Sequence, residues 1–189
     1  MKAPDFDYEK PATLDAALAV LAGGGEVEPL AGGQSLMPMM NFRIAAPEML
    51  LDLNGLDELS GIAVEDGWLV IGAMTRYRML ERSGDVAAAA PLMMKALPHI
   101  AHAAIRNRGT LGGSVALADP AAEMPAVLRA LGGEIVLQSS DGERRVASDD
   151  FFLGLYDTAR AENELVVAIR VPVAPAGQRH GFHEIVRRH

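Results

Sequence analysis

Two Asp-Gly dipeptides, each set between short stretches rich in apolar residues, constrain the fold of this 189-residue chain more than any other feature of its sequence. Asp66-Gly67 and Asp141-Gly142 suit tight type I′ turns, because aspartate and glycine tolerate the positive φ angles that such turns require. Each pattern therefore predicts a β-hairpin. The four flanking stretches are residues 62–64, 68–71, 134–138 and 144–147. A further strand is expected over 164–172, which ends at a proline, so the middle of the chain is predicted to form an antiparallel sheet.

The N-terminal part has a different pattern, in which an amphipathic helix lies between short apolar stretches. Apolar residues recur with the spacing i, i+3, i+4, i+7 at Leu14, Ala17, Leu18 and Leu21. This spacing predicts a helix with Thr13 as its N-cap and glycines 23–25 at its end. Short buried strands are expected at 27–30 and 50–53. These elements predict a small α/β unit over residues 1–57.

Helical stretches lie between the two hairpins and complete an α+β fold. Residues 91–106 are expected to be helical with a break at Pro98. Residues 120–131 form a second predicted helix, with Asp119-Pro120 as its N-terminal signal and Gly132-Gly133 as its end.

Charge and composition exclude several classes of function. The chain carries 17 Lys and Arg against 25 Asp and Glu, a net charge of −8, without a basic cluster to bind nucleic acid or an anionic membrane. Without Cys it holds no disulfide and no cysteine-ligated iron–sulfur cluster, so such a redox centre would belong to another chain. No apolar run approaches about 18 residues, and the N-terminus lacks the pattern of an export signal, so we expect a cytoplasmic chain without a membrane span.

Two glycine-pair loops are the candidate binding elements. The first is Ala31-Gly32-Gly33-Gln34-Ser35-Leu36, and the second is Thr110-Leu111-Gly112-Gly113-Ser114. Paired glycines let backbone N–H groups converge on an anion, while Ser, Thr and Gln add side-chain donors, so each loop is a candidate phosphate cradle. The alternative is that each Gly-Gly pair only makes a turn. Neither loop fits G-x-G-x-x-G or the G-K-[ST] of a P-loop, which disfavours a Rossmann site and an NTPase.

Titratable side chains near the second loop give a weaker signal. Glu123 either accepts hydrogen bonds from a hydroxyl or amine group of a ligand or, together with Asp119, only serves the start of a helix. The histidines fall in two i, i+3 pairs, His99 with His102 and His180 with His183. Neither pair matches H-E-x-x-H or has an evident third ligand, and no Ser-His-Asp arrangement or nucleophile elbow occurs. We therefore expect no metal site and name no catalytic side chain.

The glycine loops and their surroundings resemble a known family, the FAD-binding medium subunit of molybdenum hydroxylases, as in carbon monoxide dehydrogenase and the flavin domain of xanthine dehydrogenase. The matching stretches are residues 29–38, 71–75, 106–114 and 118–123, in the family's order and spacing. The resemblance implies the vanillyl-alcohol oxidase or p-cresol methylhydroxylase type of FAD-binding fold. FAD would lie between an N-terminal subdomain, residues 1–57, and a second subdomain, residues 58–177. Residues 178–189 would begin a C-terminal segment that continues in relatives.

The resemblance also implies which residues contact non-covalently bound FAD. The first loop, residues 31–36, would wrap the pyrophosphate, and the second, residues 110–114, would approach the diphosphate and the ribityl chain. Three further expected contacts are Ile100, Glu123 and Leu165. The chain departs from the family at Glu184, where many members have a lysine near the flavin, so no role is assigned to Glu184.

In this family the substrate is hydroxylated at a molybdenum–pterin centre on a large subunit, and electrons pass through [2Fe–2S] clusters on a small subunit to FAD. The resemblance therefore implies an electron-transferring flavoprotein subunit in a hetero-oligomer, which hands electrons to NAD, quinone or oxygen. The absence of Cys is compatible with this division of labour. Two alternatives are a truncated, non-redox scaffold that holds FAD weakly or not at all, and an autonomous flavin oxidoreductase of the same fold.

Overall fold

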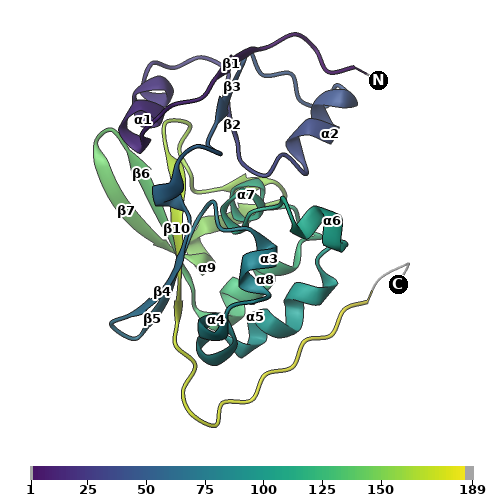
Figure 1. The fold of residues 1–189 in the computed structure, drawn as a ribbon, viewed down its shortest axis with the longest axis vertical. Helices are drawn as coiled ribbons and strands as arrows, with labels where there is room; N and C mark the ends of the chain where they lie inside the picture. The colour runs from purple at the N-terminus through teal and green to yellow at the C-terminus, as the bar shows by residue number, and fades with distance from the viewer. Residues whose placement is uncertain (1, 186–189) are drawn as a thin grey trace.

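The computed structural model describes residues 2–185, which form two main β-sheets and a separate two-stranded hairpin, with short helices around them (Figure 1). The smaller sheet is parallel and has the strand order β1-β3-β2. Its strands are β1 (Asp7–Glu9), β2 (Val27–Leu30) and β3 (Met49–Asp52), and its helices are α1 (Leu14–Ala22) and α2 (Leu36–Asn41). The predicted helix and both predicted strands of this unit are confirmed. Thr13 caps α1 as expected, since its side chain accepts a hydrogen bond from the Ala16 N–H at 3.2 Å.

The larger sheet is antiparallel and has the order β4-β5-β10-β6-β7. Its strands are β4 (Ile62–Glu65), β5 (Trp68–Gly72), β6 (Glu134–Ser139), β7 (Gly142–Ala147) and β10 (Leu165–Pro172). Both predicted hairpins are confirmed. The strand that comes last in the sequence, β10, lies between the two hairpins and joins them into one sheet.

The turns of the two hairpins differ from each other. Asp66 and Gly67 make the first turn with φ angles of 49° and 79°, as a type I′ turn requires. In the second hairpin Ser139 pairs with Gly142, so the turn consists of residues 140–141 and the predicted position at Asp141-Gly142 is wrong by one residue. Gly142 instead opens β7 with a φ of 131°, a conformation that other side chains rarely adopt.

A layer of short helices lies on one face of the larger sheet (Figure 1). The α-helices are α3 (Tyr77–Leu80), α4 (Gly84–Ala89), α5 (Pro91–Ala96), α6 (Ala103–Arg106), α7 (Leu111–Leu117), α8 (Glu123–Leu131) and α9 (Ser148–Phe151). Two 3-10 helices, η1 (Asp57–Leu59) and η2 (Leu97–His99), and a small hairpin, β8 (Phe152–Gly154) with β9 (Asp157–Thr158), complete the described elements. Within residues 2–185, no helix has the length and apolar character needed to cross a membrane.

The predicted helix over residues 91–106 is divided into α5, η2 and α6. The expected break at Pro98 is confirmed, because this proline lies in the 3-10 turn. A second interruption follows at Ala101, whose φ of 43° is incompatible with a right-handed helix.

The other predicted helix begins later than expected, at Glu123 rather than Pro120. Asp119 does not cap it. The Asp119 Oδ1 accepts a hydrogen bond from the Ala121 N–H at 2.9 Å, which stabilises a turn before the helix instead. The predicted end is confirmed, since Gly132 is the C-cap of α8 with a φ of 64°.

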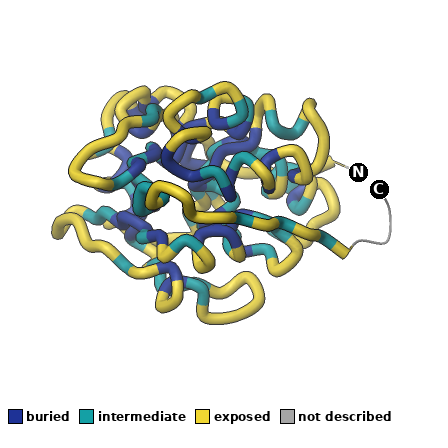
Figure 2. The backbone as a smooth tube through the Cα atoms, turned by 90° about the horizontal axis from the view of Figure 1, so that it is seen from below, coloured by how far each residue is buried: buried dark blue, intermediate teal, exposed yellow. Residues whose placement is uncertain are grey.

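Side chains on the larger sheet alternate between two hydrophobic cores. On β10, Ile169 enters the main core under the helical layer, whereas Val167 enters a second core; on β6, Ile135 and Val136 divide in the same way. The second core also contains Leu51 of β3, so it joins the two sheets. Buried positions lie between these layers, while the outer loops are exposed (Figure 2).

The chain leaves β10 at Pro172 and runs without regular secondary structure along the helical layer as far as residue 185 (Figure 1). Phe182 packs against the main core, and its ring centroid lies 5.0 Å from that of His99. Residues 186–189 of the expected C-terminal segment lie outside the described residues. The predicted limits of the subdomains, at residues 57 and 177, stay predictions.

Candidate functional site

The two glycine loops, which are far apart in the sequence, are in contact. A Cβ atom at Gly32 would lie 2.4 Å from the carbonyl oxygen of Arg108 and 2.8 Å from the Cα of Gly109, distances that only glycine allows. On the other side of this contact, a Cβ atom at Gly113 would lie 3.4 Å from the Cβ of Ala31. The fold therefore brings together the two loops that the sequence analysis selected.

The first loop presents a run of unused backbone donors. Among the described residues, the N–H groups of residues 32–35 have no hydrogen-bond acceptor. Gly33 takes a φ of 68°, and the Gln34 Nε2 donates to the carbonyl oxygen of Gly32 at 3.0 Å. Successive free N–H groups in such a turn form an anion-binding concavity. The geometry of this loop fits the predicted phosphate cradle.

The second loop uses its backbone donors within the protein. It forms the start of α7, with Thr110 as the N-cap. The N–H groups of residues 111–114 donate to the carbonyl oxygens of Thr75 and Ala73 and to the Oγ1 and carbonyl oxygen of Thr110, at 2.9–3.2 Å. These four N–H groups are therefore occupied within the protein, and the interpretation of this loop as a phosphate cradle stays a prediction. The side-chain donors of this loop are the hydroxyl groups of Thr110, which is 3% exposed, and of Ser114, which is partly exposed.

Glu123, one of the expected contacts, lies in a cluster of charged side chains. Burial raises the pKa of the Glu123 carboxyl group, and the carboxylates of Glu184 and Asp119 raise this pKa further, against the opposing effects of its own N–H and of His99. The His99 Nδ1 lies 3.2 Å from the Glu184 Oε2. Ile100, which follows His99 in the sequence and is another of the expected contacts, is 7% exposed. The raised pKa makes Glu123 easier to protonate, and a protonated carboxyl group donates a hydrogen bond as well as accepting one.

Leu165 is placed differently from the other expected contacts. Its side chain is 2% exposed and belongs to the second core, together with residues of α1 and β3. The side chain therefore has almost no surface to offer a ligand, which leaves the backbone of Leu165 as the part that can make the expected contact.

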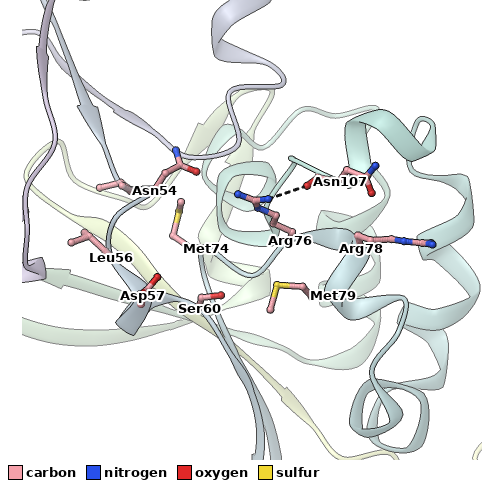
Figure 3. Close-up of a pocket in the computed structure, with 10 residues that line it drawn as sticks. Asn54, Leu56, Asp57, Ser60, Met74, Arg76, Arg78, Met79 and Asn107 are labelled. Carbon is pink, nitrogen blue, oxygen red and sulfur yellow. Dashed lines mark hydrogen bonds between the residues drawn. The ribbon is translucent and has the colours of Figure 1, made fainter.

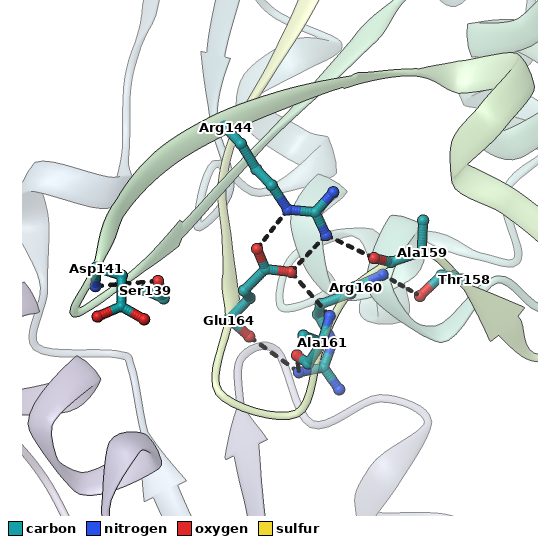
Figure 4. A network of polar contacts seen from close by, with 8 residues as sticks. All are labelled: Ser139, Asp141, Arg144, Thr158, Ala159, Arg160, Ala161 and Glu164. Carbon is teal, nitrogen blue, oxygen red and sulfur yellow. Dashed lines mark hydrogen bonds and ion pairs between the residues drawn. The ribbon is translucent and has the colours of Figure 1, made fainter.

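A network of polar contacts stabilises the loop that precedes Leu165 (Figure 4). Arg144 donates to both carboxylate oxygens of Glu164, at 2.5 and 2.7 Å, and to the carbonyl oxygen of Ala159 at 2.7 Å. The Ala161 N–H donates to the same carboxylate at 2.8 Å, and Arg160 donates to the backbone carbonyl of Glu164 at 2.9 Å. The Arg144 guanidinium is the main cause of the lowered pKa of the Glu164 carboxyl group.

Residues 4–174 match the family described as the FAD binding domain in molybdopterin dehydrogenase. The chain is 42% identical to the caffeine dehydrogenase subunit beta of Pseudomonas sp. strain CBB1, over 100% of this chain and 65% of that protein. It is also 42% identical to the carbon monoxide dehydrogenase medium chain of Hydrogenophaga pseudoflava, over 98% of this chain and 65% of that protein.

A solved structure shows the same fold. It is the carbon monoxide dehydrogenase of Hydrogenophaga pseudoflava that lacks the Mo-pyranopterin moiety of the molybdenum cofactor, with a TM-score of 0.97 and 43% identity, over 100% of this chain and 66% of that chain. The chain thus spans slightly less than two thirds of the length of these relatives. The expected mixture of helices and strands is confirmed, and so is the expected family. This chain belongs to the family of FAD-binding domains found in molybdopterin dehydrogenases.

Proposed function

We propose that this chain binds FAD non-covalently where its two glycine loops meet. The observation that carries the proposal is the set of unused N–H groups at residues 32–35, where Gly32 packs against Arg108 and Gly109, the two residues that precede the second loop. A pyrophosphate is the part of FAD that such a concavity recognises, because it offers several anionic oxygens to converging donors. The family description supports the choice of ligand.

Each remaining polar group has a distinct task in this proposal. The hydroxyl groups of Thr110 and Ser114 would donate to the diphosphate and ribityl region, and Glu123 would hydrogen-bond polar atoms of the cofactor from its half-buried position. Ile100 and the backbone of Leu165 would complete the contacts. FAD, when bound, accepts and releases electrons, while the chain positions it and limits its exposure to water. No side chain is assigned a proton-transfer role.

We further propose that the protein is the electron-transferring flavoprotein subunit of a molybdenum hydroxylase. Electrons would arrive from [2Fe–2S] clusters of a small partner subunit, after substrate oxidation at a molybdenum–pterin centre on a large subunit, and would leave for an external acceptor such as NAD, quinone or oxygen. The names of the relatives, a dehydrogenase subunit beta and a carbon monoxide dehydrogenase medium chain, support such a division among subunits. The vanillyl-alcohol oxidase type of fold and the cytoplasmic location belong to the same proposal.

A titration with FAD tests the cofactor assignment. The purified chain is mixed with FAD, passed through a desalting column and examined by visible absorbance. We expect one flavin per chain, with the absorbance bands of protein-bound flavin. If the protein stays colourless after incubation with excess FAD, this result would contradict the proposal and favour the non-redox scaffold.

Replacing Thr110 with alanine separates helix capping from ligand binding. The Thr110 Oγ1 accepts the Gly113 N–H at 3.2 Å, so Thr110→Ala is expected to lower the free energy of unfolding by about 1 kcal/mol. Ser83 caps α4 in the same way, accepting the Val86 N–H at 3.3 Å, and Ser83→Ala is the matched control. We expect similar losses in chemical denaturation but weaker FAD binding only for Thr110→Ala. Equal FAD affinity in both variants would remove Thr110 from the site.

A further inference from the structure

A chain of hydrogen bonds connects the smaller sheet to the first glycine loop. Asp52, at the end of β3, accepts a hydrogen bond from the Tyr8 hydroxyl through one carboxylate oxygen. Its other oxygen accepts from the Asn54 backbone N–H at 2.9 Å and from the Asn54 Nδ2 at 2.6 Å. The same Nδ2 donates to the carbonyl oxygen of Ala31 at 2.8 Å. Asn54 thus links a sheet residue that is 7% exposed, Asp52, to the first residue of the loop.

The orientation of the Asn54 amide is fixed by its partners. Asp52 and the Ala31 carbonyl are both acceptors, so only the NH₂ group of Asn54 can face them, and it uses both of its hydrogens. Burial acts to raise the pKa of Asp52, but hydrogen bonds from Tyr8 and Asn54 outweigh it and hold this pKa below the usual value. Asp52 is therefore ionised at neutral pH, which strengthens the hydrogen bonds that it accepts.

Fixing the Ala31 carbonyl also fixes the direction of the Gly32 N–H. The two groups belong to one planar trans peptide unit and point in opposite directions. The Gln34 side chain fixes the direction of the Gly32 carbonyl in the same manner. Because this carbonyl and the Gly33 N–H belong to one peptide unit, the direction of the Gly33 N–H is fixed as well. Two side-chain amides thus orient two successive peptide units whose N–H groups have no acceptor among the described residues. Glycine would otherwise permit these units to rotate, since it populates many φ and ψ values.

We propose that Asn54 is a positioning residue for the pyrophosphate of FAD, which holds the Ala31–Gly32 peptide unit so that its N–H points at the anion. This inference rests on the proposed function and adds a residue that lies outside both glycine loops. Asn54 does not touch the ligand. It acts through the loop backbone, with Asp52 and Tyr8 as its support.

Asn54 is well placed for a substitution test. It is exposed and lines one edge of a cavity of about 470 Å³ between the smaller sheet and α3, together with Met74, Arg76 and Asn107 (Figure 3). A replacement side chain can therefore turn into open space instead of overpacking a core. Asn107, on the opposite side of the same cavity, is also exposed and provides a matched control; its backbone carbonyl accepts from Arg76, but its side chain makes no hydrogen bond among the described residues.

The test compares Asn54→Leu with Asn107→Leu in the whole chain. We expect Asn54→Leu to raise the Kd of FAD about tenfold, the effect of losing a hydrogen bond worth ~1.4 kcal/mol, and to leave the Kd of riboflavin unchanged, since riboflavin has no phosphate. Asn107→Leu should change neither Kd. An equal effect on FAD and riboflavin, or no effect on FAD, would overturn the positioning role.

A second measurement does not depend on the cofactor. In the ligand-free chain, backbone NMR order parameters of Gly32 and Gly33 are expected to fall in Asn54→Leu from values of rigid backbone, about 0.85, to those of a flexible loop, below about 0.6. Unchanged order parameters would contradict the proposal. Failure of the wild-type chain to bind FAD would instead overturn the proposed function, and the two results are distinguishable.

An exchange of the two side chains guards against a simple loss of folding. The double variant Asp52→Asn with Asn54→Asp restores a hydrogen bond between positions 52 and 54 but offers no donor to the Ala31 carbonyl. Its melting temperature should be closer to the wild-type value than that of Asn54→Leu, while its FAD affinity stays as low as that of Asn54→Leu. Recovery of FAD affinity in this variant would show that the bond to Ala31 is not the one that matters.

Discussion

Replacing Gly32 with alanine is expected to abolish stable FAD binding and to destabilise the fold. The new methyl group would have to fit 2.4 Å from the Arg108 carbonyl oxygen and 2.8 Å from the Gly109 Cα, and both neighbours are backbone atoms that no rotamer change can move. Relief requires the two loops to separate. Overpacking of this kind lowers the free energy of unfolding by about 2–3 kcal/mol. Because the separation also displaces the unused N–H groups, we expect FAD affinity to fall roughly a hundredfold, equivalent to ~2.7 kcal/mol.

Gly84→Ala is the matched control for this prediction. Gly84 begins α4, and a Cβ atom there would meet nothing within 4 Å. Alanine favours the helix over glycine, so this variant should be as stable as the wild type or slightly more stable. Chemical denaturation and the FAD titration are measured on both variants. Wild-type behaviour of Gly32→Ala in both assays would mean that the two loops do not meet as closely as the structure shows.

The sequence identified both glycine loops but not the contact between them. Glycine pairs flanked by Ser, Thr and Gln signal local donors, and that signal depends only on neighbours along the chain. The packing of Gly32 on Gly109 depends on how two sheets share a core, and no spacing rule reports it. For the same reason the internal hydrogen bonds of the second loop, to Ala73 and Thr75, could not be anticipated.

Asn54 and Glu164 lacked any signal in the sequence. Asn54 lies in a short turn after β3, and asparagine is a common residue in turns. Glu164 is one of 25 acidic residues, and nothing in the sequence distinguishes it from the others. Their roles come from tertiary partners, Ala31 for the first and Arg144 for the second. Only the folded arrangement distinguishes them from solvated polar residues.

The fold was more predictable where local chemistry decides the structure. The Asp66-Gly67 turn and the glycine that ends α8 follow from φ preferences, and both are confirmed. The start of α8 was misplaced because Asp119 has two competing uses, as a helix cap or as the acceptor of a turn, which sequence alone does not rank. The central place of β10 depends on long-range pairing with β5 and β6, and a mainly apolar eight-residue strand does not itself specify its partners.

Replacing Arg144 with methionine is expected to lower the free energy of unfolding by about 2 kcal/mol. The Glu164 side chain is 9% exposed, and without Arg144 its carboxylate keeps the Ala161 N–H but loses its closest cation. Loss of one partner of a buried pair costs about 3–5 kcal/mol, and we expect less here because the Arg144 side chain is 47% exposed and screened by water. Arg129→Met is the control, since the Arg129–Asp149 pair is 53% and 72% exposed and should contribute less than about 1 kcal/mol.

The same pair predicts a pH dependence of stability. The folded-state pKa of Glu164 is lowered, mainly by its hydrogen bonds from Arg144, so the folded chain binds this proton less readily than the unfolded chain does. The stabilisation is therefore complete above the unfolded pKa of about 4.3 and is lost as the pH falls below it toward the folded value. Urea denaturation of the wild type and Glu164→Gln should differ most near neutral pH, and the difference should shrink in acid. A difference that is constant with pH would mean that the charge of Glu164 contributes nothing, and that its hydrogen bonds alone hold the loop before β10.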